Sequence, residues 1–289
     1  MQKEYNSSMS NQIASAYDDF SSEYDRFVNW TNRLRFELPF LTSKLAQAPQ
    51  AVGRLPRVLD AACGTGQHAL ALAGLGYAAA GADLSAGMIQ RARENAQARD
   101  QNVPFAVAGF GALAAEFGEA SFDALLCLGN SLPHVLDEAG LAMALGDFAQ
   151  VLRPGGVLIL QQRNFDAVLA QGTSGRWMGP EAARDGETEW LFVRFYDFRP
   201  DHLIDFNILR LKREGDGAWQ QALTQTRLRP LVQDDLDAAL TVAGFERVEW
   251  YGGLDGSPFD PAVSGNLVVV AYSGDRLSTD FGNGLNGLS

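Results

Sequence analysis

The stretch Val58-Leu-Asp-Ala-Ala-Cys-Gly-Thr-Gly66 has the composition of a buried strand that ends in a tight turn. Its first residues are apolar, and its two glycines permit backbone conformations and close approaches that a side chain would hinder. A helical pattern follows at once over residues 67–75, so the turn presents backbone amides at the start of a helix. This order predicts a ligand site at the carboxyl end of a strand.

Short apolar runs alternate with helical patterns on both sides of this turn. Near-continuous apolar strands that alternate with helices are typical of a parallel sheet covered by helices on both faces. We therefore predict a doubly wound α/β fold with a seven-stranded sheet. The expected strands are residues 57–61, 78–82, 104–108, 122–128, 157–161, 245–251 and 266–272, and the expected helices between them include 67–75, 86–98, 141–151 and 233–243.

The remaining segments predict three additions to this sheet. Residues 1–50 carry aromatic and apolar residues at helical spacing, including a pattern over 34–45, and are expected to form an N-terminal helical cap. Residues 164–229 contain three strand-like runs, which predict an antiparallel platform inserted on the substrate side. The main domain then comprises residues 51–163 and 230–273, and the polar tail at 274–289 is expected to be mobile.

Composition narrows the classes of function. The 289 residues carry 23 Lys and Arg against 35 Asp and Glu, a net charge of −12 that should repel a nucleic-acid backbone. No nucleic-acid partner is therefore expected. No run of about 18 apolar residues occurs and no apolar signal begins the chain, so we expect a cytoplasmic protein without a membrane partner. Cys63 and Cys127 lack partners at metal-ligand spacing, so we expect buried thiols and no metal site.

The two glycines alone do not identify the ligand, because such a turn also suits a dinucleotide. The phosphate-binding pattern Gly-x-Gly-x-x-Gly has a third glycine where this chain has Ala69. Asp60 opens the turn and would repel pyrophosphate, but it suits the cationic head of an amino acid. Asp83, at the end of the next strand, is placed to accept hydrogen bonds from ribose hydroxyls with either ligand. We interpret His68 only as a residue of the first helical turn.

Three motifs, taken in order, resemble those of the class I S-adenosylmethionine-dependent methyltransferases. They are Asp60-Ala-Ala-Cys-Gly-Thr-Gly66, Asp83-Leu-Ser-Ala-Gly-Met88 and Leu152-Arg-Pro-Gly-Gly156. The resemblance implies a Rossmann-like methyltransferase fold with S-adenosylmethionine as the cofactor and S-adenosylhomocysteine as its product. It also implies transfer of the methyl group to a small molecule.

Two further segments, Cys127-Leu-Gly-Asn-Ser-Leu-Pro-His134 and Gln162-Arg-Asn-Phe-Asp166, resemble the glycine and sarcosine N-methyltransferase branch. That branch implies an amino-terminal arginine on the cofactor carboxylate, for which Arg33 is the candidate, and it suggests self-association into a homo-oligomer. The candidate cofactor-binding residues are Tyr24, Trp30, Arg33, Asp60, Ala62, Gly64, Asp83, Leu84, Met88, Gly109, Phe110 and Leu128.

Several positions depart from that branch. Gly109 stands where many relatives place an acid or amide beside the adenine, so adenine recognition is expected to fall to Phe110. Gln162 and Phe165 replace the His and Tyr of the branch's His-Arg-Asn-Tyr-Asp. Phe206 replaces an aromatic residue that carries a hydroxyl.

Arg163 is the candidate for binding an acceptor carboxylate, because a guanidinium can hold a carboxylate through two parallel hydrogen bonds. The alternative is an ion pair with a neighbouring acid. Asn130 and His134 are candidates for the same catalytic network, with a turn-stabilising amide and a packed histidine as the competing interpretations. Tyr17 and Trp177 are expected as aromatic walls of the pocket.

The leading hypothesis is methylation of the amine nitrogen of glycine, sarcosine or a similar carboxylate-bearing amine. A second is O- or N-methylation of a larger secondary metabolite, which the departures at Gln162 and Phe206 favour. An NAD-dependent oxidoreductase is a third, although Ala69 and Asp60 argue against it. A cofactor-binding protein without turnover is the last alternative.

Overall fold

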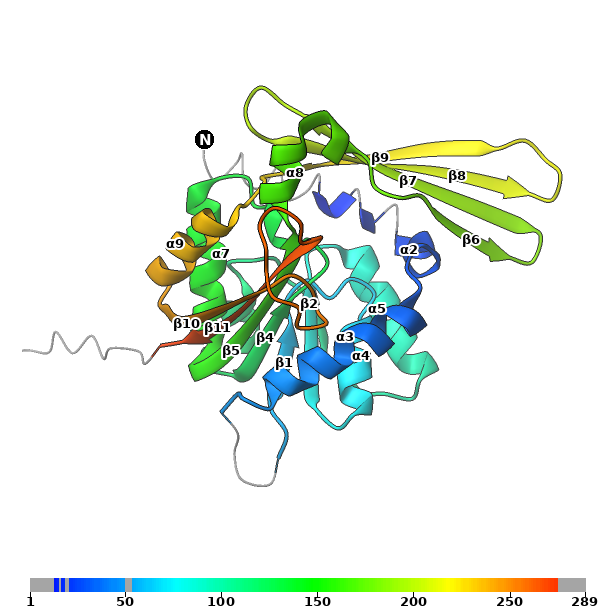
Figure 1. Cartoon of the computed structure of the whole chain (residues 1–289). Coiled ribbons are helices and arrows are strands. Elements are labelled where there is room, and N and C mark those ends of the chain that lie inside the picture. Colours follow the sequence, from blue (N-terminus) through cyan, green and yellow to red (C-terminus); the bar gives the residue numbers. More distant parts are fainter. Residues whose placement is uncertain (1–12, 16, 19–20, 50–53, 275–289) are drawn as a thin grey trace, which may run out of the picture.

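A computed structural model describes residues 13–15, 17–18, 21–49 and 54–274 of the chain. The described part contains a seven-stranded sheet and a four-stranded sheet, with helices around the larger one (Figure 1). The tail expected to be mobile lies outside the described residues, apart from Gly274, and so do residues 1–12 of the expected cap.

The seven-stranded sheet has the order β10-β11-β5-β4-β1-β2-β3. Strands β1 to β5 run parallel, whereas β11 is antiparallel to both β5 and β10. The order reverses beside β1, with β2 on one side and β4 on the other, which confirms the doubly wound prediction. The strands are Arg57–Asp60 (β1), Ala78–Asp83 (β2), Phe105–Val107 (β3), Phe122–Cys127 (β4), Leu152–Arg163 (β5), Phe245–Tyr251 (β10) and Asn266–Ser273 (β11).

Helices cover both faces of this sheet (Figure 1). One apolar cluster joins the sheet to α3 (Trp30–Leu45), α4 (Gln67–Gly74) and α5 (Ala86–Ala98). A second joins the opposite face to α6 (Leu113–Phe117), α7 (Glu138–Val151) and α9 (Gln233–Val242). Strand β4 is therefore buried along its whole length, as the nearly continuous apolar run in its sequence predicts, and its one acid, Asp123, pairs with Arg54 and Arg153.

The four-stranded sheet is antiparallel with the order β6-β7-β8-β9, and we call it the platform. It extends away from the body of the molecule (Figure 1). Alternate residues of β7 point to opposite faces. The inner face carries Trp190, Phe192, Arg194 and Tyr196, and the outer face carries Phe195 and Asp197. The strands are Glu181–Asp185 (β6), Thr188–Phe198 (β7), Ile204–Glu214 (β8) and Gln220–Leu228 (β9).

Several elements differ from the expectation. Helix α3 begins at Trp30 rather than residue 34, because the Asn29 side chain accepts a hydrogen bond from Asn32 N and caps it. Helix α7 begins at Glu138, where Asp137 is the cap. The sequence analysis did not predict β6, α6 or α8 (Phe165–Gln171), which have five to seven residues each and carry too short a pattern to be recognised.

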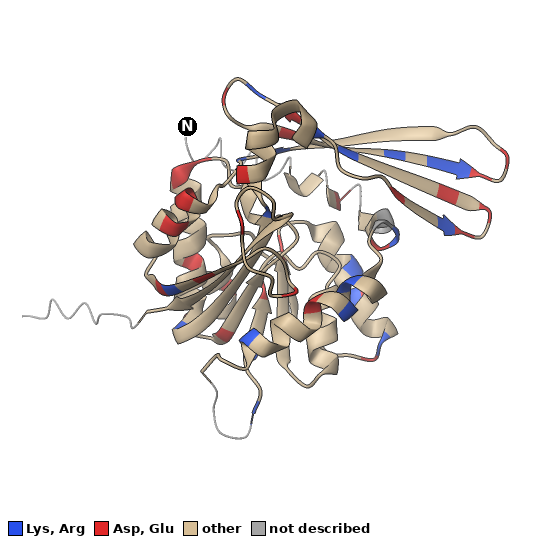
Figure 2. Ribbon diagram, in the orientation of Figure 1, with Lys and Arg blue, Asp and Glu red and all other residues tan. Residues whose placement is uncertain are grey.

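The cysteines, the helix lengths and the charged residues can each be compared with the composition of the chain. Cys63 and Cys127 are both buried and unpaired, as predicted. No helix within the described ranges is long and apolar enough to cross a membrane. Figure 2 shows Lys and Arg interleaved with Asp and Glu along the platform strands.

Asp147 on α7 connects this helix to α6 on the same face of the sheet. It is buried, and it accepts hydrogen bonds from Gly111 N, Leu113 N and Ala114 N over 2.7, 2.8 and 2.9 Å. These amides begin α6, so the carboxylate holds the loop that precedes the helix.

Asp147→Ala should lower the free energy of unfolding by about 2–4 kcal/mol, because it leaves several amides without an acceptor. Urea denaturation measures this loss. The matched control is Gln150→Ala on the exposed side of the same helix, which should change stability by less than about 0.5 kcal/mol. Equal stability of the two variants would contradict the proposed role of Asp147.

Candidate active site

The turn after β1 is held by its glycines and by Asp83. Gly64 and Gly66 have φ values of 51° and 79°, in the left-handed region that side chains disfavour. A Cβ at Gly66 would lie 2.7 Å from the ring of Phe105. Gly64 N donates to Asp83 Oδ2 over 2.9 Å. The turn therefore lies against the end of β2, and no larger residue fits at position 66.

Asp83 in turn connects the end of β2 to the start of α5. Its Oδ1 accepts a hydrogen bond from Ser85 N over 2.9 Å. Ser85 Oγ accepts one from Met88 N over 3.0 Å and caps α5. Burial raises the pKa of Asp83, although these hydrogen bonds oppose the shift. Each carboxylate oxygen has a second lone pair, so Asp83 can still accept a hydrogen bond from a ligand.

Asp60 is the least satisfied polar side chain of the turn. It is 2% exposed, and no side chain among the described residues donates a hydrogen bond to its carboxylate, which has only the backbone amide of Ala62 nearby as a donor. Burial raises its pKa to about 6; Asp83 adds to the shift, and the charges of His68 and Arg33 oppose it. An unpaired buried carboxylate is costly unless a cation compensates it. The site therefore fits a ligand with a positively charged group.

Helix α2 (Ser21–Phe27) crosses the glycine turn and is tied to it through Asp25. Asp25 Oδ1 accepts hydrogen bonds from Thr65 Oγ1 over 2.6 Å and from Trp30 Nε1 over 3.0 Å. Asp25 Oδ2 accepts one from Asn95 Nδ2 on α5 over 3.0 Å. The amino-terminal helices thus form a lid over the end of the sheet.

Arg33 is oriented within this lid by an ion pair and by a ring. Its Nε donates to Glu37 Oε1 over 2.9 Å, and its guanidinium lies 5.0 Å from the ring centre of Trp30. Glu37 is also 2.6 Å from His68 Nε2. Although burial opposes it, the pairing with His68 and Arg33 lowers the pKa of Glu37. His68 is therefore a buried partner of the lid, and the interpretation that it is only a helix residue was incomplete.

A cavity of about 420 Å³ lies between the lid and the carboxyl ends of β1, β2 and β4. Every residue predicted to bind the cofactor lines it. They are Tyr24, Trp30, Arg33, Asp60, Ala62, Gly64, Asp83, Leu84, Met88, Gly109, Phe110 and Leu128.

The cavity also has walls that the sequence analysis missed. Val135, Asp137 and Met143 line it from the segment after β4 and from α7. No motif marks these positions, and their place depends on how α7 packs beside Phe110. Tyr17, expected as an aromatic wall, does line the cavity.

The three candidate catalytic residues occupy different places. His134 lines the cavity, and its Nε2 lies 3.0 Å from the Tyr17 hydroxyl. Burial lowers the pKa of His134 to about 4, so its ring is neutral near pH 7. Asn130 and Arg163 lie outside the cavity lining. Asn130 Oδ1 accepts a hydrogen bond from Arg163 N over 2.9 Å, which favours the turn-stabilising interpretation of this carbonyl.

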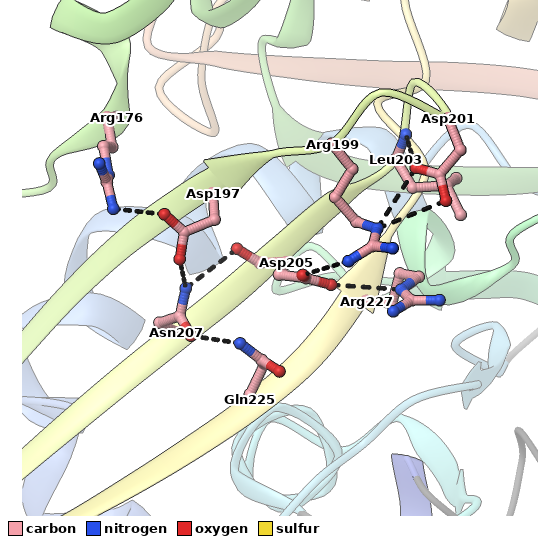
Figure 3. A network of polar contacts seen from close by, with 9 residues as sticks. All are labelled: Arg176, Asp197, Arg199, Asp201, Leu203, Asp205, Asn207, Gln225 and Arg227. Carbon is pink, nitrogen blue, oxygen red and sulfur yellow. Dashed lines mark hydrogen bonds and ion pairs between the residues drawn. The ribbon is translucent and has the colours of Figure 1, made fainter.

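Trp177 was wrongly expected at the pocket wall. It is 60% exposed and packs on Phe195 at the outer face of the platform, with ring centres 5.1 Å apart. Figure 3 shows the polar network of that face, in which Asn207 donates to Asp197 and accepts from Gln225 over 2.9 and 2.8 Å. A pattern of residue types does not tell which face of a short segment turns inward.

The inner face of the platform meets the end of β5 at Arg163. The Arg163 guanidinium donates a hydrogen bond to the hydroxyl of the buried Tyr196, whereas its Nε has no partner among the described residues. Arg194 is near enough that its charge and that of Arg163 act on each other. Asp166, the neighbouring acid, instead accepts from Gln233 N over 3.1 Å. Sequence reasoning missed Arg194 and Tyr196, because only the folded structure brings β7 of the platform near Arg163 at the end of β5.

The sequence is similar to known methyltransferases. A family model described as a methyltransferase domain matches residues 58–156, which span the cavity-lining motifs. The chain is 28% identical to a glycine/sarcosine N-methyltransferase of Halorhodospira halochloris, covering 81% of this chain and 80% of that protein. It is 29% identical to one of Aphanothece halophytica, covering 81% of each chain.

The fold has solved counterparts. An S-adenosylmethionine-dependent methyltransferase from Clostridium acetobutylicum superposes with a TM-score of 0.69 at 17% identity, covering 89% of this chain and 99% of that one. The chain carries a methyltransferase domain over residues 58–156. Over four fifths of its length it is similar to glycine/sarcosine N-methyltransferases, and it has the fold of an S-adenosylmethionine-dependent methyltransferase.

Proposed function

We propose that the chain methylates the amine nitrogen of a small carboxylate-bearing amine of the glycine and sarcosine class. The observation that carries the proposal is the position of Arg163, whose guanidinium is held by Tyr196 beside the cavity with one nitrogen unpartnered. The names of the relatives from Halorhodospira and Aphanothece support the same class of acceptor.

The polar side chains of the cavity suit the chemical groups of the methyl donor. Asp60 suits the ammonium of the methionine part, and Asp83 suits the ribose hydroxyls. Arg33 suits the carboxylate, since Glu37 occupies its Nε and leaves the terminal nitrogens to a ligand. Phe110 lines the cavity and packs edge-on against Phe148, so its ring is fixed where adenine is expected.

When bound, S-adenosylmethionine supplies an activated methyl group on a sulfonium. The chain then needs to place an amine lone pair in line with that methyl group and to exclude water. Arg163 would hold the acceptor by its carboxylate, and the lid would close the cavity. The amine nitrogen gains the methyl group, the sulfur keeps the electron pair of the broken bond, and the extra proton leaves to solvent.

His134 is suited to positioning rather than to proton removal near pH 7. Its low pKa makes it a weak base, and its Nε2 already contacts the Tyr17 hydroxyl. Burial raises the pKa of Tyr17, so this hydroxyl stays protonated. We therefore propose that His134 and Tyr17 shape the cavity wall and set its polarity. The acceptor amine then loses its proton in solvent, before it binds.

The charge of Asp60 should control how tightly the cavity binds the donor product. The raised pKa means that burial disfavours the ionised acid, so the free protein loses stability as the pH rises through about 6. A bound ammonium compensates the ionised form. The affinity for S-adenosylhomocysteine should thus increase about tenfold between pH 5 and pH 7 and then level off.

Calorimetry at pH 5, 6, 7 and 8 measures this dependence. Asp60→Asn should bind more weakly at pH 7 and remove the rise, which separates Asp60 from His68 and Asp83 in the same cavity. An unchanged pH profile in Asp60→Asn would show that another group controls binding.

Arg163 should control how well the acceptor is used. Arg163→Ala should lower kcat/KM for glycine or sarcosine by about a hundredfold, because it removes a charge-assisted pair worth roughly 3 kcal/mol. The affinity for S-adenosylhomocysteine should stay within about twofold, since Arg163 does not line the cavity.

Arg247→Ala on β10 is the control, because it removes an arginine that stacks on Tyr272 away from the cavity. It should retain the activity of the unchanged protein. If Arg163→Ala methylates these acceptors as fast as the control does, the proposed carboxylate contact is wrong.

A further inference from the structure

The turn that follows β4 has an uncommon backbone conformation. Gly129 and Asn130 have φ values of 75° and 68°, so two consecutive residues lie in the left-handed region. Glycine adopts this region freely, whereas for asparagine it is uncommon and costs free energy. Such a conformation persists only where the surrounding contacts fix it, and it is frequent at active sites. The residues that fix this turn are therefore candidates for a role in the reaction.

Gln161, near the end of β5, fixes the turn through two hydrogen bonds. Its side-chain Oε1 accepts one from Gly129 N over 2.8 Å, and its backbone carbonyl accepts one from Asn130 N over 3.1 Å. Both amides of the left-handed pair thus donate to the same residue. Gln161 Nε2 in turn donates to Oδ1 of Asn266, the first residue of β11, over 3.1 Å. The two side-chain contacts together fix the orientation of the Gln161 amide.

The same turn is next to both of the arginines assigned to the methyl donor and the acceptor. A Cβ at Gly129 would lie 4.0 Å from Arg33 Nη2. Asn130 Oδ1 accepts a hydrogen bond from Arg163 N over 2.9 Å. Arg163 is two residues after Gln161 on β5, so their side chains point to the same face of the sheet. The turn therefore connects the donor side of the site to the acceptor side.

The turn also contributes to the wall of the cavity. Leu128, Gly129 and Ser131 line the cavity, whereas Gln161 and Asn266 lie outside its lining. Ser131 Oγ donates to Leu128 O over 2.8 Å, which closes the turn on itself. Gln161 is therefore placed to act on a bound molecule through the turn and not by direct contact.

Methyl transfer is sensitive to this kind of positioning. The amine lone pair must point along the bond from the sulfur to the methyl carbon, and a displacement of about 1 Å can lower the rate about a hundredfold. Arg163 would fix only the carboxylate end of the acceptor. The turn after β4 is suited to confine the amine end, because it joins the cavity wall to the backbone of Arg163.

We propose that Gln161 is a positioning residue of the methyl transfer. It holds residues 128–131 in the left-handed turn, so that an acceptor bound by Arg163 presents its amine to the methyl group. The inference rests on the proposed function, because it assumes that Arg163 holds the acceptor. It goes further by assigning the alignment of the reacting groups to a residue outside the cavity lining.

Gln161→Met tests this role, because methionine keeps the length of the side chain and removes the acceptor for Gly129 N. Its kcat with glycine or sarcosine should fall about tenfold, since the amine is no longer held in line with the methyl group. The KM for the acceptor and the affinity for S-adenosylhomocysteine should each stay within about threefold, since Arg163 and the cavity residues are retained. Steady-state kinetics and calorimetry measure these values.

Gln161→Glu is the conservative variant, which separates positioning from a merely structural role. A glutamate keeps an acceptor oxygen for Gly129 N, and its other oxygen can accept from the Asn266 amide after that amide turns over. It should restore kcat to within about threefold of that of the unchanged protein. The control is Tyr272→Phe, which removes a hydrogen bond to Gln47 at the far end of the pair formed by β5 and β11 and should leave kcat unchanged.

Two further measurements keep the test independent of a single variant. Hydrogen–deuterium exchange of the peptide with residues 128–131 should be about tenfold faster at Gly129 N in Gln161→Met, because this amide has lost its acceptor. Asn266→Ala releases the Gln161 amide but keeps its oxygen, so kcat should fall by a smaller factor of about threefold. This variant carries the test if Gln161→Met does not bind S-adenosylhomocysteine.

The inference is overturned if Gln161→Met, or Asn266→Ala in its place, has the kcat of the control. It is also overturned if Gln161→Glu is as slow as Gln161→Met, or if exchange at Gly129 N does not change. In those cases methylation of glycine or sarcosine by the unchanged protein would leave the proposed function standing. If the unchanged protein binds S-adenosylhomocysteine but methylates no carboxylate-bearing amine, the proposed function fails, and the inference fails with it.

Discussion

The site depends on the close contact of the turn after β1 with the end of β2 and with Phe105, the first residue of β3. Gly66 leaves no room for a Cβ beside Phe105, and Gly64 donates its amide hydrogen to Asp83. These contacts fix the backbone amides at the start of α4 and the carboxylates of Asp60 and Asp83 on one side of the cavity. Two acids and a turn with two glycines are therefore placed where they suit the chemical groups of the methyl donor.

The lid and the platform complete the site at the end of the sheet. Strands β1 and β2 end in acids, which suit the cationic and hydroxyl parts of the donor, whereas the lid contributes Arg33. Strand β5 ends in Arg163, which contacts Tyr196 of the platform. The anionic groups of donor and acceptor would thus meet Arg33 and Arg163. Asp25 connects the lid to α5 and to the glycine turn, so closure of the cavity and the shape of the donor site are linked.

The sequence predicted the fold, and it named residues for the donor side that the structure gathers around one cavity, because both depend on local patterns. Residues 86–98 and 245–251 were predicted with the bounds of α5 and β10, and every predicted cofactor residue lines the cavity. The acceptor side was predicted less well. Arg163 could be named from a motif, but Arg194 and Tyr196 depend on the register of β7, and Trp177 was assigned to the wrong face. Such positions follow from long-range strand pairing, which a single sequence does not display.

The central claim is that this cavity and Arg163 together direct a methyl group to the nitrogen of a carboxylate-bearing amine. The most direct measurement is incubation with S-adenosylmethionine labelled in its methyl group and a panel of amines and hydroxylated metabolites, followed by identification of the labelled products. The account predicts label on the nitrogen of amines that carry a carboxylate. Label on an oxygen, or only on amines without a carboxylate, would contradict it.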